Sequence, residues 1–192
     1  MHGRWADYRQ AVVDIRVGER NTVRVTPCAA GVTEGAFPEP SGRTVHIITA
    51  ANPRGRVVAP EDNTWAHALL LDELACGGHT WWPATGGSPC GTHTEESVAV
   101  TGLTDAEARA LGRRFGQDAV FAWSREAWRL LACFGERSAV AGWRTVPAPP
   151  CPTRRSRRPC APTLPRPPRP APPCPTTTPL SDSPPDATAS TC

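Results

Sequence analysis

The sequence predicts an α+β domain: a ferredoxin-like two-layer sandwich in which an antiparallel sheet carries two helices on one face. Two amphipathic helical segments, each lying between apolar β-branched runs, give the order strand, helix, strand, strand, helix, strand. Two right-handed split crossovers then build the sandwich. A sharp change in composition after residue 146 predicts a disordered C-terminal tail.

The first half of the predicted core holds one strand and one helix. The β-branched run 45–50 ends at an Asn-Pro turn, as a central strand would. A helix is expected to begin at Pro60, whose fixed φ suits a first turn, and to end at Gly77 and Gly78. Three segments precede this core: a weak helix over 4–15, a short strand over 22–27 and a loop over 28–43.

The second half contains the clearest helix signal. Thr104 and Glu107 have the spacing of a capping box, and Gly116 suits the position after the last turn. Four strands are expected around this helix, over 79–84, 97–103, 118–123 and 127–133. The last two are predicted to form a hairpin through residues 124–126, which adds one C-terminal strand to the sandwich.

The domain is expected to span residues 1–146 and the tail 147–192. Of the 23 prolines, 16 fall between Pro147 and Pro185, whereas all seven tryptophans precede them. A segment so poor in apolar side chains cannot offset its own chain entropy by burial. Two interpretations of the tail stay open: a functional linker, or GC-rich DNA translated out of its proper frame.

Charge argues against specific nucleic-acid binding. The tail carries six arginines against two aspartates, a net of +4, so the other residues of the +3 chain sum to about −1. Specific binding would require a basic stripe on the folded part. All 21 basic residues are arginine, which indicates a GC-rich, bacterial coding sequence. With neither a signal peptide nor a membrane-spanning apolar run, we expect a cytoplasmic protein with reduced thiols and no membrane partner.

One cysteine and histidine pattern has the spacing of a zinc site. Cys76, His79, Cys90 and His93 form C-x2-H, ten residues, then C-x2-H. The predicted strand between the two pairs would hold them roughly 15 Å apart, at ~3.3 Å per residue. We therefore expect no metal and no cofactor, and keep a zinc-stabilised interaction module as an alternative.

Three motifs resemble a bacterial and phage family known as domain of unknown function 3293. They are T-A-x-N-P with Asn52 and Pro53, E-x-S with Glu95 and Ser97, and F-G-Q-D-A over 115–119. The resemblance covers about residues 43–133. The family often has an aromatic residue where this chain has Ala51, and an acidic residue where it has Cys90.

The predicted topology brings polar motifs to one edge of the sheet, because neighbouring strands run antiparallel. The residues expected there are Asn52, Asn63, His93, Glu95, Ser97, Gln117 and Asp118. Each has a structural explanation as a turn, cap or strand-start residue, but their convergence favours a polar cleft. We predict a ligand- or partner-binding accessory protein that recognises a small molecule or another protein. The alternative is a small hydrolase or transferase using His93, Glu95, Ser97 and Gln117.

Overall fold

The computed structural model describes residues 2–19 and 21–148, with side chains from residue 5 onward. Nearly all of the predicted tail therefore lies outside the described residues. The described part contains three α-helices, α1 (His2–Gln10), α2 (Pro60–Cys76) and α3 (Asp105–Arg114), and a short 3-10 turn, η1 (Pro53–Gly55). Its strands are β1 (Val12–Arg16), β2 (Thr22–Cys28), β3 (Thr33–Glu34), β4 (Val45–Thr49), β5 (Thr80–Gly87), β6 (Thr94–Thr101), β7 (Ala119–Trp123), β8 (Trp128–Ala132) and β9 (Ser138–Pro147).

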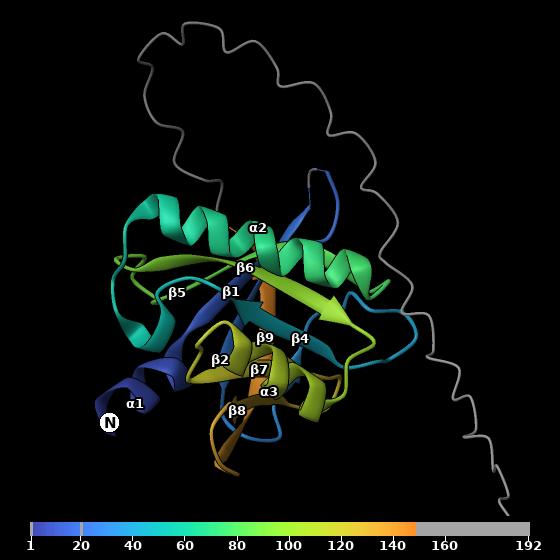
Figure 1. Cartoon of the computed structure of the whole chain (residues 1–192). Helices are drawn as coiled ribbons and strands as arrows, with labels where there is room; N and C mark the ends of the chain where they lie inside the picture. The colour runs from blue at the N-terminus through green and yellow to red at the C-terminus, as the bar shows by residue number, and fades with distance from the viewer. Residues whose placement is uncertain (1, 20, 149–192) are drawn as a thin grey trace, which may run out of the picture. The chain divides into compact units, whose positions relative to one another are not determined.

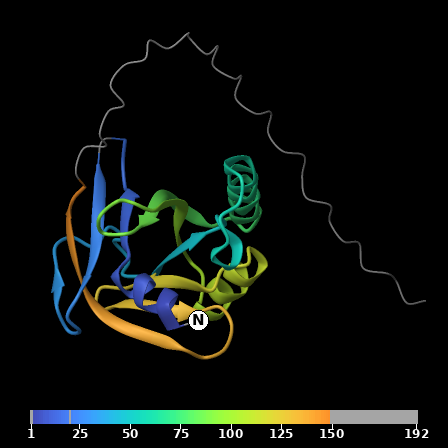
Figure 2. The same cartoon turned by 90° about the vertical axis from the view of Figure 1, so that its left-hand side faces the viewer.

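Eight antiparallel strands form a closed barrel. Their order is β2-β1-β5-β6-β4-β7-β8-β9, and β9 pairs with β2 to complete the ring. The closing register runs from Val23 opposite Pro147 to Cys28 opposite Gly142. The two-residue strand β3 lies outside this ring and pairs in parallel with β9. Figure 2 shows the strands curving round a ring, with α2 and α3 to one side of it.

The prediction of a ferredoxin-like two-layer sandwich is therefore wrong. The segment 12–16, assigned to the end of the N-terminal helix, is strand β1, and the ten-residue strand β9 was not predicted at all. These two strands, with β2, connect β5 to β8 and so remove both edges of the expected sheet. Closure satisfies the backbone hydrogen bonds that an open sheet leaves unpaired at its edges.

Side chains that alternate along the strands form two separate hydrophobic clusters. The outer cluster, which α2 and α3 cover, includes Ile48, Val98 and Val120 from the strands and Leu70 and Leu74 from α2. Figure 1 shows both helices lying against the strands. The inner cluster lies inside the barrel and consists of Val13, Ile15, Val25, Val45, Ile47, Ala84, Ala99, Trp123, Trp128 and Trp143. Its partly buried neighbours include Trp82 and Phe121.

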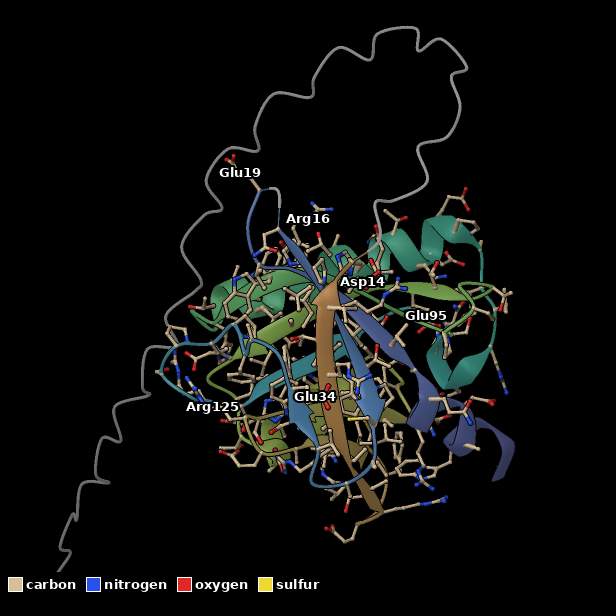
Figure 3. The ribbon with its side chains drawn as sticks, turned by 180° about the vertical axis from the view of Figure 1, so that it is seen from behind. Asp14, Arg16, Glu19, Glu34, Glu95 and Arg125 are labelled. Atoms are coloured by element: carbon tan, nitrogen blue, oxygen red, sulfur yellow. The ribbon has the colours of Figure 1, made fainter. Side chains whose placement is uncertain are left out.

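Aromatic rings fill one end of the barrel. Phe37, from the loop after β3, meets Trp123 edge-on at 4.9 Å between ring centroids, and Trp123 meets Trp143 at 5.4 Å. The guanidinium of Arg125, in the β7–β8 turn, lies 5.7 Å from the Phe37 centroid. Figure 3 shows Arg125 and Glu95 on opposite sides of the barrel. This closed end leaves the Glu95 end as the place where a ligand could enter.

In the described part of the chain, no helix has the length and apolar character needed to cross a membrane.

Candidate binding site in the barrel

A cavity of about 530 Å³ lies at the Glu95 end of the barrel. There β4 and β5 end and β6 and β7 begin. Ile47, Phe121 and Leu130 form its apolar wall, and polar side chains stand nearer the rim. Helix α1 contributes Asp7 and Tyr8 to the lining, and Figure 2 shows this helix in front of the ring of strands. The cavity is thus partly covered by the N-terminal helix.

Strand periodicity explains which residues reach the cavity. Alternate residues of a strand face the same side of a sheet, and the interior of a barrel is one such side. On β6 the cavity is lined by Glu95 and Ser97, four and two positions before Ala99 of the inner cluster. Their neighbour Glu96 is exposed on the other face. On β7, Ala119 and Phe121 line the same cavity.

A strained turn after β4 places Asn52 at the rim. Asn52 has φ 49° and Arg54 has φ 57°, the left-handed region that asparagine tolerates better than most residues. The side-chain oxygen of Asn52 is fully used: Oδ1 accepts from Val58 N at 3.3 Å and from Asn63 Nδ2 at 3.2 Å. Its backbone N–H donates to Asn63 Oδ1 over 2.8 Å. Asn63 therefore holds the turn from helix α2 and does not line the cavity.

Glu95 brings a carboxylate to the cavity rim. Its Oε1 accepts a hydrogen bond from Asn52 Nδ2 at 2.8 Å and one from His93 Nε2 at 3.2 Å. The Glu95 side chain is 21% exposed, against 59% for His93. Two donors on one oxygen fix the direction of the carboxylate while its second oxygen stays unbonded among the described residues.

The F-G-Q-D-A motif packs directly on the Asn52 turn. Gly116 has φ +66°, and a Cβ placed there would lie 2.9 Å from the Pro53 Cβ. Its carbonyl accepts from Arg54 N at 2.8 Å. Gln117, which is 8% exposed, donates from Nε2 to Ala51 O at 2.9 Å and to Phe115 O at 3.3 Å. Both motifs thus support one corner of the cavity.

Of the seven residues expected at one edge, five line this cavity: Asn52, His93, Glu95, Ser97 and Gln117. Asn63 does not line the cavity but forms hydrogen bonds with Asn52, which does. Asp118 is not part of the lining, and its backbone carbonyl accepts from Cys133 N at 2.9 Å. Antiparallel pairing of β4, β6 and β7 is the reason for this convergence.

The hydroxyl of Ser97 is not positioned as a nucleophile. Its Oγ donates to the backbone carbonyl of Glu95 at 3.2 Å and makes no recorded contact with His93, whose Nε2 faces the Glu95 carboxylate instead. A nucleophile and its base should lie within hydrogen-bond reach of one another. Among the described residues, the hydrolase or transferase alternative thus lacks its central contact.

The residues of the zinc alternative lie at the two ends of one strand. Cys76 ends α2 and His79 precedes β5, whereas Cys90 and His93 follow the far end of that strand. Within residues 2–19 and 21–148, no group of three or more His, Cys, Asp or Glu side chains is arranged to hold a metal ion. The geometry gives this alternative no support.

Two lining features could not be found from the sequence motifs. Tyr8 and Asp7 come from α1, outside the family-like segment, and Phe121 was assigned to a strand but not to the cavity. Cys90, one of the four residues in the zinc pattern, also lines the cavity, and its hydrogen bonds with Thr92 and Ser88 lower its pKa to about 7. The alternation of Val13 and Ile15 with Asp14 and Arg16 was the signal for β1, and hence for a barrel.

Comparison with known proteins agrees with these motifs. Residues 48–120 match the family described as protein of unknown function (DUF3293). This match supports assigning that segment to the family. The segment contains the end of β4, all of α2, β5, β6 and α3, and the start of β7, together with the Asn52, Glu95 and Gln117 motifs that meet at the cavity. No curated protein and no solved structure matches the chain.

Proposed function

We propose that this DUF3293 protein binds a small molecule with a mainly apolar body in the barrel cavity. An eight-stranded barrel has an interior just wide enough to hold one small ligand. The cavity volume of about 530 Å³ falls within the usual range for small-molecule sites. A protein partner is less compatible with a site enclosed by strands and partly covered by α1.

One observation carries the proposal: the cavity joins an apolar wall to a polar rim within the same enclosed space. Ile47, Phe121 and Leu130 supply the wall from three neighbouring strands. Asn52, Glu95 and Gln117 stand at the rim in fixed orientations. An apolar lining with few, well-held polar groups is the usual composition of a ligand pocket.

A cytosolic location remains part of this proposal. Cys28, Cys90 and Cys133 are free thiols, as expected for a reducing compartment.

Binding of a neutral apolar dye, N-phenyl-1-naphthylamine, tests the proposal. We expect saturable, one-to-one fluorescence enhancement by the full chain. Ala119→Phe should abolish it, since Ala119 lines the cavity and a larger side chain would fill the entrance. Ala75→Phe, on an exposed position of α2, is the matched control and should bind the dye normally.

Circular dichroism of both variants establishes that the fold is retained. Non-saturable dye binding to the wild type, or unchanged binding by a folded Ala119→Phe variant, would overturn the proposed function.

A further inference from the structure

Four side chains that line the cavity already use donors in hydrogen bonds within the protein. Asn52 Nδ2 donates to Glu95, and Gln117 Nε2 donates to two backbone carbonyls. Thr49 Oγ1 donates to Glu96 O at 2.7 Å, and Ser97 Oγ donates to Glu95 O. Among these four side chains, only Asn52 keeps an unused donor, the second hydrogen of Nδ2.

Acceptors, in contrast, remain available. Within the described part of the chain, Glu95 Oε2 and Gln117 Oε1 accept no recorded hydrogen bond, although both side chains line the cavity. Gln117 is more than nine-tenths buried, so its unpaired oxygen has only the cavity from which to gain a partner.

The orientation of the two amides is fixed by their partners. Gln117 Nε2 faces two carbonyl oxygens, so a flipped amide would set oxygen against oxygen. Asn52 Nδ2 faces a carboxylate, while Oδ1 faces the backbone N–H of Val58. The excess of acceptors is therefore a property of the site.

The charged residues that line the cavity also favour a ligand that donates hydrogen bonds. Asp7 and Glu95 both line the cavity, and no arginine stands among the described residues of the lining, although the chain has 21 basic residues, all of them arginine. An anionic head group would meet two carboxylates there. A cationic one would meet acceptors and opposite charge.

We propose that the ligand is an organic cation: an apolar body that ends in a primary ammonium group, seated between Glu95 Oε2 and Gln117 Oε1. This inference rests on the proposed function. An ammonium carries three donors and no acceptor, which matches the unused capacity of the rim. Its hydrogen bond to the carboxylate would be charge-assisted and thus stronger than a neutral one.

Four eight-carbon ligands that differ only in the head group test this inference by displacement of N-phenyl-1-naphthylamine at pH 7. They are octylamine, octanol, octanoate and octyltrimethylammonium. Octylamine should bind about 10- to 100-fold more tightly than octanol, the range of a hydrogen bond to a charged group. Octanoate should bind most weakly. Octyltrimethylammonium, which has the charge but no N–H, should be weaker than octylamine.

Glu95→Gln should remove the preference for octylamine, measured as the ratio of its affinity to that of octanol. Glu96→Gln, one residue away on the exposed face of β6, is the matched control and should keep the preference. Equal binding of octanol and octylamine by the wild type would overturn the inference, as would tighter binding of octanoate or a preference that persists in Glu95→Gln.

If Glu95→Gln does not fold, the ligand series on the wild-type protein still tests the head-group inference. Octyltrimethylammonium, which lacks an N–H donor, should bind more weakly than octylamine. If dye binding itself is absent, the proposed function fails. If the dye binds but the amine has no advantage, only the head-group inference fails.

Discussion

Asn52 donates a hydrogen bond from Nδ2 to Oε1 of Glu95 over 2.8 Å, joining two residues 43 positions apart in the chain. The bond connects the turn after β4 to the start of β6, across the mouth of the cavity. Because the other Asn52 contacts use its oxygen and backbone N–H, the side chain orients Glu95 and is itself held in place. The stability of this corner should therefore depend on the amide nitrogen.

Asn52→Asp is expected to lower the free energy of unfolding at pH 7 by about 1–3 kcal/mol, because a carboxylate oxygen would replace the donor that faces Glu95. Repulsion would raise the pKa of one carboxyl of the pair in the folded state. The penalty should then diminish as the pH falls through that raised pKa and a proton is shared. Urea denaturation at pH 7 and pH 4 measures both effects.

The same change at an exposed asparagine, Asn21→Asp, is the control and should have little effect at either pH. An Asn52→Asp variant as stable as wild type at pH 7 would contradict the role assigned to this bond.

Gly116→Ala should be more destabilising than Gly91→Ala. Both glycines have positive φ, +66° and +73°, so each substitution incurs the left-handed penalty of about 1–2 kcal/mol. Only at Gly116 would the new methyl also lie 2.9 Å from Pro53 Cβ, whereas nothing lies within 4 Å at Gly91. Thermal or urea denaturation should show an additional loss of at least about 1 kcal/mol for Gly116→Ala. Equal losses would show that the turn simply shifts to accommodate the methyl.

The convergence of the rim residues was predictable, although the fold class was not. The convergence depends only on the local pairing of β4 with β6 and β7, which follows from the two crossovers between strands. Asn52, Glu95 and Gln117 lie at or near the ends of β4, β6 and β7. Their positions therefore do not depend on whether the other strands close the barrel.

Closure of the barrel depends on weaker signals far apart in the sequence. The apolar spacing of Tyr8, Val12 and Ile15 fitted a helix, which in fact ends at Gln10. Strand β9 alternates small residues such as Ala139 and Ala141, whose β propensity is low, and pairs with β2 more than 100 residues away. In both β1 and β9, pairing with neighbouring strands outweighs the local propensity of the sequence. The apolar wall of the cavity could not be inferred without that closure.

Cys90 should react with iodoacetamide at a rate that rises through pH 7 and levels off above it. Hydrogen bonds between Sγ and the hydroxyls of Thr92 and Ser88 lower the thiol pKa to about 7, so the reactive thiolate is already abundant at neutral pH. Peptide-resolved mass spectrometry separates Cys90 from the other cysteines. Thr92→Val should move the midpoint to higher pH, whereas Thr64→Val, in helix α2, should not. If the alkylation rate of wild-type Cys90 has its midpoint above pH 8.5, the hydrogen bonds do not stabilise the thiolate.

His46 makes the fold sensitive to acid. It is fully buried, and desolvation lowers its pKa despite the opposing effect of Asp105, whose Oδ1 lies 3.0 Å from Nε2. Asp105 also accepts a hydrogen bond from Arg129 Nη2 at 3.1 Å, and the Arg129 charge disfavours protonation of the histidine. The unfolded chain therefore takes up a proton near pH 6.5 that the folded state resists. The free energy of unfolding therefore has its full value above that pH and decreases as the pH is lowered further.

Urea denaturation between pH 7.5 and pH 5 measures this loss. His46→Phe should make the free energy of unfolding nearly independent of pH over this range. The substitution removes the buried titrating group, while Asp105 keeps its pairing with Arg129. His93→Gln changes a histidine whose side chain is 59% exposed and should leave the dependence intact. A slope that survives His46→Phe would mean that another group, outside the contact between β4 and α3, links proton uptake to unfolding.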